Sequence, residues 1–172
     1  LLLLFIPLVS FGQEFDSFKS KDGTEIFFQQ FGDSGETIVL LSGGPGLNPY
    51  YLEPLYIELK KKYECILLHQ RGTGESLLDE VNQESLTVQK YIDDLNGLYK
   101  KLGKEKLVLV GHSWGGMLSF SYAANEPNKV KKVILLNTGG VTDAFYTWFG
   151  SNINMRFCLL YTSPSPRDLS TS

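Results

Sequence analysis

Short apolar runs alternate with stretches of helical periodicity along most of the chain. The runs cover residues 37–41, 65–68, 107–110 and 133–136, and each is almost entirely apolar. An unbroken apolar run is typical of a strand that is covered on both faces, as in a parallel sheet. Strands that alternate with helices build βαβ units with right-handed crossovers. The pattern therefore predicts an α/β fold with a mainly parallel sheet.

Residues 14–31 have a different pattern, with two short runs around the turn signal Lys21-Asp22-Gly23. Apolar and polar residues partly alternate in 25–31, which indicates half-exposed strands. We therefore expect antiparallel first strands before the parallel part of the sheet.

Two of the three predicted helices flank candidate loops. After Pro49, an amphipathic helix would carry its apolar side on Tyr51, Leu55, Ile57 and Leu59. A second, apolar helix is expected over 117–124, and it stops around 125–127, where an asparagine and a proline occur.

The third predicted helix lies between these two. Apolar residues recur at spacings of four, three, four and three from Val88 to Leu102. Ser85 or Thr87 can cap its start, and Gly103 can end it.

The composition is that of an ordinary globular protein. The chain has 172 residues, of which 42% are hydrophobic and 20% are charged, and its formal net charge is −3. This length fits one domain, and the lack of a basic excess argues against a nucleic-acid partner. Cys65 and Cys158 have neither metal-ligand spacing nor a disulfide framework. No metal is therefore expected, and Cys65 is interpreted as a buried core thiol.

The strongest candidate chemistry lies at Gly111-His112-Ser113-Trp114-Gly115. This G-x-S-x-G set stands directly between a predicted buried strand and a predicted helix, which is the context of a nucleophile elbow. Such a turn would lift the Ser113 hydroxyl above the sheet as the catalytic nucleophile. Gly111 and Gly115 are expected because a Cβ at either place would collide with the neighbouring strand or helix. A glycine-rich turn without chemistry is the alternative, and the strand–helix context favours the elbow.

A second candidate site is the loop Ser42-Gly43-Gly44-Pro45-Gly46, which follows the first apolar run. A hydrolase stabilises the oxyanion of its reaction with two backbone N–H groups. One comes from the residue after the nucleophile, here Trp114, and the other from this loop, where Gly44 is the candidate. The alternative is a plain Gly/Pro turn.

Three motifs together resemble the proline iminopeptidases and their close relatives. They are Gly43-Gly44-Pro45-Gly46, the segment QRGTGES at 70–76, and the elbow with Gly116, and the resemblance runs from about residue 22 to 140. In that family the first motif usually begins with His, where this chain has Ser42, and the second with Asp, where it has His69. The resemblance implies the α/β-hydrolase fold, no cofactor, and a small peptide whose N-terminal residue, often proline, is released. Arg71 and Glu75 are expected to pair beneath the pocket.

No histidine follows Ser113 in the sequence, although the fold orders its triad as Ser, then Asp or Glu, then His. His69 and His112 are expected to shape loops rather than act as general base, and Asp143 is interpreted as solvated. The triad acid and base are thus missing from the chain, which we interpret as the N-terminal part of a hydrolase, catalytically incomplete as given.

Four segments are expected from this interpretation. Residues 13–140 would be the N-terminal part of the hydrolase domain, truncated before the cap and the last strands, and 141–157 would begin the cap. An aromatic cluster there would line a substrate pocket or pack the cap against the core; it contains Phe145, Tyr146, Trp148 and Phe149.

The two terminal segments complete the division. Residues 1–12 look like a partial signal peptide with a cleavage site before Gln13, which predicts an exported protein, periplasmic or secreted, without a stable membrane anchor. The alternative is an apolar first strand. Residues 158–172 begin with CLLYTSPSPRD, which resembles a translated sequencing adapter and is expected to be non-native; the alternative is a Ser/Pro-rich disordered tail.

Two further functions remain open. A small carboxylic ester or an acylglycerol could replace the peptide as substrate, because the elbow GHSWGG also occurs in esterases and lipases of the fold. A non-catalytic binding protein on the same fold is the alternative from another class, and the intact Ser113 argues against it.

Overall fold

The computed structural model describes residues 15–140, 142, 144, 147–148 and 151. The segments 1–12 and 158–172 therefore lie outside the described residues, as do Asp143, Phe145, Tyr146, Phe149 and Cys158. The chain divides into two units, Leu1–Thr138 and Gly139–Ser172. The site described below belongs entirely to the first unit.

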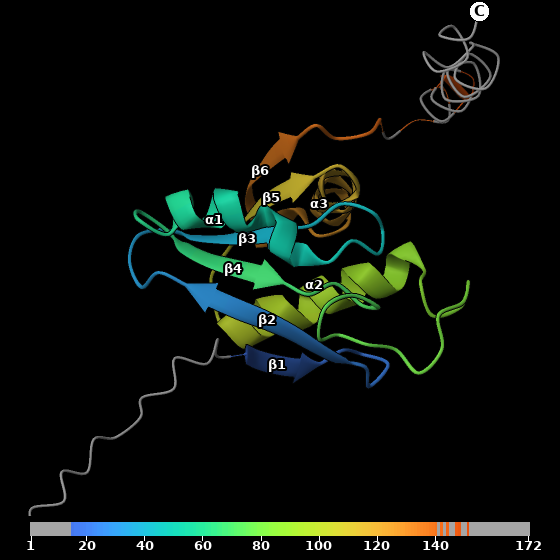
Figure 1. Cartoon of the computed structure of the whole chain (residues 1–172), viewed down its shortest axis with the longest axis horizontal. Coiled ribbons are helices and arrows are strands. Elements are labelled where there is room, and N and C mark those ends of the chain that lie inside the picture. Colours follow the sequence, from blue (N-terminus) through green and yellow to red (C-terminus); the bar gives the residue numbers. More distant parts are fainter. Residues whose placement is uncertain (1–14, 141, 143, 145–146, 149–150, 152–172) are drawn as a thin grey trace, which may run out of the picture. The chain divides into compact units, whose positions relative to one another are not determined.

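The described strands form one sheet of six strands in the order β1-β2-β4-β3-β5-β6 (Figure 1). The first two strands are antiparallel to each other, β2 is antiparallel to β4, and the remaining neighbours are parallel. The bounds are Phe15–Lys19, Glu25–Phe31, Thr37–Leu41, Glu64–Leu68, Leu107–His112 and Val130–Leu136 for β1 to β6. The expected α/β fold with antiparallel first strands is confirmed.

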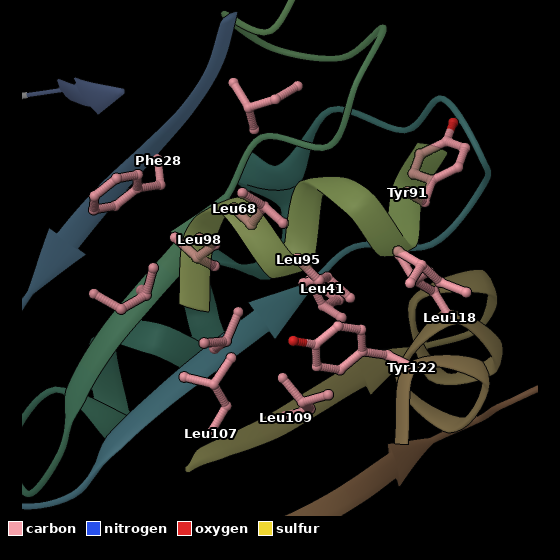
Figure 2. Close-up of a cluster of buried hydrophobic side chains, with 14 residues drawn as sticks. Phe28, Leu41, Leu68, Tyr91, Leu95, Leu98, Leu107, Leu109, Leu118 and Tyr122 are labelled. Atoms are coloured by element: carbon pink, nitrogen blue, oxygen red, sulfur yellow. The ribbon is translucent and has the colours of Figure 1, made fainter. Parts of the chain in front are cut away.

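Helices cover both faces of the central strands β3, β4 and β5, which explains their unbroken apolar runs. The run in β6 is not covered in this way, since Ile134 and Leu135 are 40% and 48% exposed, and the expected burial is wrong for this strand. In β3, Val39 and Leu41 join a core cluster with α2 (Val88–Leu102) and α3 (Trp114–Asn125), which Figure 2 shows. Ile38 and Leu40 point to the other face and pack with α1 (Glu53–Leu59). Cys65 is fully buried in this second cluster, as expected for a core thiol.

The helix caps follow local sequence signals. Thr87 caps α2, since its side chain accepts a hydrogen bond from the Lys90 amide, and Gly103 ends the helix in the left-handed conformation. Ser85 instead hydrogen-bonds within the loop before the helix, to Asn82. At the end of α3, Pro127 begins a short 3₁₀ turn, η2 (Pro127–Lys129).

The predicted helix over 51–59 is confirmed only in part of its apolar side. The segment splits into a 3₁₀ turn, η1 (Pro49–Leu52), and α1. Leu55 and Leu59 pack against the second core cluster as predicted, but the most buried side chains of 51–59 are Leu52 and Tyr56. Tyr51 and Ile57 are 41% and 39% exposed. A 3₁₀ turn has about three residues per turn and an α-helix about 3.6, so one period cannot describe both pieces.

The parallel register brings three loops to one edge of the sheet. Leu41 in β3 is paired with Gly111 in β5, and Leu40 is paired with Leu67 in β4. The loops after β3, β4 and β5 therefore leave the sheet side by side. Open α/β sheets bind ligands outside the carboxyl ends of their strands.

Candidate active site

Ser113 lies on the tight turn between β5 and α3. Its backbone has φ 52° and ψ −116°, a positive φ that a non-glycine residue rarely adopts. The Ser113 amide donates to the Leu136 carbonyl at 3.0 Å, and its carbonyl accepts from the amides of Gly116 and Met117 at 3.0 and 3.3 Å. Such backbone conformations cost about 1–3 kcal/mol each and persist where the surroundings impose them. The turn is thus held by β6 on one side and by the first turn of α3 on the other.

The elbow glycines are required by close approach. A Cβ on Gly111 would overlap the carbonyl group of Gly115, and a Cβ on Gly115 would overlap the carbonyl groups of Leu41 and Ser42. These are backbone atoms that cannot rotate away. The helix α3 therefore begins in direct contact with the end of β3. This agrees with the expectation that a Cβ at Gly111 or Gly115 would collide with the neighbouring strand or helix.

The loop after β3 passes close to Ser113. A Cβ on Gly43 would lie 3.1 Å from the Ser113 Cβ and 3.2 Å from both His112 Nδ1 and Tyr51 Oη. The Gly43 amide donates to Tyr51 Oη at 2.6 Å. Among the described residues, the amides of Gly44 and Trp114 have no hydrogen-bond acceptor. The two candidate oxyanion donors are thus uncommitted, whereas the Gly43 amide is engaged.

His112 contacts Tyr51 and not the nucleophile. Its Nδ1 lies 2.8 Å from Tyr51 Oη, and the two rings meet edge to face with centroids 5.5 Å apart. Because the Tyr51 oxygen accepts from Gly43, its hydroxyl proton is available for His112 Nδ1. Tyr51 was assigned only to a helix face by the sequence pattern, and its place beside Ser113 was missed.

His69 is fully buried and shapes the loop that follows β4. Its Nδ1 accepts from the Glu75 amide at 3.0 Å, and its Nε2 lies 3.4 Å from Gln29 Oε1. Burial lowers the pKa of His69 to about 4, so the imidazole is neutral at pH 7. A neutral ring with the proton on Nε2 satisfies both contacts. These are the contacts of the loop-shaping residue that was expected.

Arg71 does not pair with Glu75, which corrects the expected ion pair. Arg71 is 1% exposed, and its Nε and Nη2 donate to the Asp94 carboxylate at 2.7 and 2.6 Å. A buried guanidinium needs a carboxylate partner within reach, and Glu75 is exposed whereas Asp94 is buried beside Arg71. The missed signal was the position of Asp94 between Tyr91 and Leu98 on the buried side of α2.

Asp22 is the second partner of Arg71. It accepts from Nη1 at 3.0 Å, and this hydrogen bond holds the pKa of the Asp22 carboxyl well below its usual range. Burial opposes the charge of Arg71, but the hydrogen bonds to both aspartates outweigh it and raise the pKa of the guanidinium. The network therefore connects the loop after β4 to α2 and to the β1–β2 turn.

Gln70, between His69 and Arg71, connects the loop after β3 to the elbow. Its Nε2 donates to the Ser42 carbonyl at 2.7 Å and to Ser42 Oγ at 3.0 Å, and its Oε1 accepts from Trp114 Nε1 at 3.1 Å. Both Gln70 and Ser42 are buried. Sequence reasoning named Gln70 only as part of a motif.

Two other features were searched for in the described part of the chain, a metal site and a membrane-spanning helix. It contains no group of three or more His, Cys, Asp or Glu side chains placed to hold a metal ion. None of its helices combines the length and apolarity that crossing a bilayer requires.

Comparison with known proteins places the chain in a family. The alpha/beta hydrolase fold family matches residues 36–160, and the chain belongs to this family, whose members are generally hydrolases. A cis-3-alkyl-4-alkyloxetan-2-one decarboxylase of Shewanella oneidensis is 36% identical over 71% of this chain and 38% of that protein. A proline iminopeptidase of Lactobacillus helveticus is 33% identical over 67% of this chain and 41% of that protein.

A solved structure shows the same fold. An epoxide hydrolase of Vigna radiata superposes with a TM-score of 0.68 at 20% identity, over 80% of this chain and 47% of that one. The chain spans about two-fifths of the length of the two curated relatives above. Relatives of similar identity thus carry different activities, and they place the chain in the family without selecting one of them.

Proposed function

We propose that Ser113 is the nucleophile of a serine hydrolase that forms and then hydrolyses an acyl-enzyme. The observation that carries the proposal is the position of Ser113 on a strained turn at the carboxyl edge of the sheet, with the Gly43 loop in contact with it. A serine hydroxyl attacks an acyl carbon once a base accepts its proton. The uncommitted amides of Gly44 and Trp114 would then stabilise the oxyanion.

The base and the acid would come from the natural sequence downstream of residue 157. His69 is buried and committed to the loop after β4, and His112 Nδ1 is engaged by Tyr51. The relatives are more than twice as long as the matched segment. We propose an N-terminal peptide residue, often proline, as the group transferred, on the strength of the three motifs and the proline iminopeptidase relative.

The test is covalent labelling of the protein expressed from the complete gene, recovered from the source DNA. That gene also shows whether residues 158–172 belong to the protein. A fluorophosphonate probe is expected to label the protein at Ser113, and Ser113→Ala is expected to abolish labelling. Ser121→Ala, on the same helix, is the matched control and keeps it.

Chromogenic substrates then separate the substrate classes. Turnover of a proline arylamide well above that of a short-chain nitrophenyl ester supports the aminopeptidase, and the reverse order supports an esterase. A correctly folded full-length protein that the probe does not label would contradict the nucleophile and favour a binding protein.

A further inference from the structure

Gln70 lies at the junction of the two segments that carry the proposed oxyanion donors. The Ser42 carbonyl and hydroxyl belong to the loop that contains Gly44, and the indole belongs to Trp114. A single buried amide therefore contacts both segments. The three groups come from β3, β4 and β5, which are neighbours in the sheet.

The orientation of the Gln70 amide follows from its partners. An indole N–H can only donate, and a carbonyl oxygen can only accept. The Gln70 oxygen must therefore face Trp114, and its NH₂ must face Ser42. A glutamate at position 70 has the same shape and could still accept from Trp114 Nε1. Its other carboxylate oxygen, however, would face the Ser42 carbonyl oxygen, and two acceptors repel each other.

The Trp114 ring is restrained on a second side. Its indole meets the Tyr91 ring edge to face with centroids 5.5 Å apart, while Nε1 donates to Gln70. Trp114 is the first residue of α3, so restraint of its side chain also restrains the backbone amide that begins the helix.

We propose that Gln70 is a positioning residue that sets the spacing of the Gly44 and Trp114 amides in the oxyanion hole, an inference that rests on the proposed function. Preorganised donors act on the charge that develops in the transition state, so a displaced donor lowers kcat more than it changes substrate binding. A residue that served only folding would lower the number of active molecules and leave each remaining site unchanged.

The experiment compares Gln70→Glu with the wild type in the complete protein. Active sites are counted by the end point of fluorophosphonate labelling, and kcat and KM are then measured per titrated site. We expect kcat per site to fall about tenfold or more, with KM within about threefold. The exposed Gln83→Glu is the matched control for the added charge and keeps the wild-type values.

Trp114→Phe provides a second variant, because it keeps an aromatic ring and removes only the indole donor. The loss of kcat per site is expected to be smaller than for Gln70→Glu, because the contact of Gln70 with Ser42 remains. If Gln70→Glu does not fold, the Trp114→Phe variant alone tests the positioning role of Gln70. Wild-type kcat per titrated site in every variant that folds would overturn the positioning role.

Failure of the function and failure of this inference are distinguishable. If the wild type is not labelled at Ser113, the serine hydrolase proposal fails. If it is labelled and the variants react at the wild-type rate per site, only the role of Gln70 fails.

Discussion

The buried imidazole of His69 predicts a specific loss of stability at mildly acidic pH. The folded chain holds the pKa of His69 at about 4, while the unfolded chain has the ordinary value of about 6.5. Because the folded pKa is lowered, the unfolded state binds the proton more readily, and stability falls as the pH drops from about 6.5 towards 4. These two values predict a loss of about 2 kcal/mol in the free energy of unfolding between pH 7.5 and pH 5.0.

Urea denaturation at these two pH values, followed by fluorescence and by circular dichroism, measures the loss. The window ends at pH 5.0 because Asp22 has a lowered pKa, and its contribution to stability is lost only in more acidic solution. A His69→Gln variant is expected to be less stable at pH 7.5 and to lack the His69 part of the pH dependence.

The chain offers a matched control for this substitution. His112→Gln removes the other histidine and leaves His69 in place, so the His69 part of the loss is expected to remain. An equal pH dependence in wild type and His69→Gln would refute the reasoning, since it would mean that protonation of His69 costs nothing in the folded state.

Two further predictions concern buried contacts. Arg71→Ala is expected to lower the free energy of unfolding by about 3–5 kcal/mol, because it leaves the Asp94 carboxylate buried without its partner. Lys61→Ala, which removes only an exposed ion pair with Glu58, is expected to change the free energy of unfolding little in the same urea titration. Gly115→Ala is expected to destabilise by about 1–3 kcal/mol despite the better helix propensity of alanine, because the new Cβ overlaps backbone at the end of β3. Gly97→Ala is expected to cost less, because the atoms nearest to its new Cβ belong to the Phe18 side chain, which can shift. Thermal unfolding that ranks the two variants in the opposite order would contradict the packing argument.

The elements that sequence reasoning predicted are those with local signals. The α2 helix combines a clear period with a capping threonine and a terminal glycine, and each of these signals lies within a few residues of what it determines. The apolar runs also marked the parallel strands correctly. In segment 49–59, the buried side was only partly predicted because the period changes at Leu52, where a 3₁₀ turn passes into an α-helix.

The contacts that could not be predicted are long-range in sequence. Arg71 reaches 23 residues to Asp94 and 49 residues to Asp22, and no local pattern states which carboxylate a buried arginine will meet. Gln70 reaches 28 residues to Ser42 and 44 residues to Trp114. These pairs depend on the strand order, which places β4 between β2 and β3, and a pattern of apolar runs does not contain that order.

The three residues that follow β4 show how this order assembles the candidate site. His69 contacts Gln29 in β2, Gln70 contacts the loop after β3 and the start of α3, and Arg71 contacts α2 and the β1–β2 turn. These three consecutive side chains of the loop contact different neighbours, so one short stretch connects several elements. The charge of Arg71 is balanced by two aspartates, while Tyr51 joins the Gly43 amide to His112, the residue before Ser113. Hydrogen bonds of Gln70 and Tyr51 therefore join the loop after β3 to both sides of Ser113, to Trp114 after it and to His112 before it.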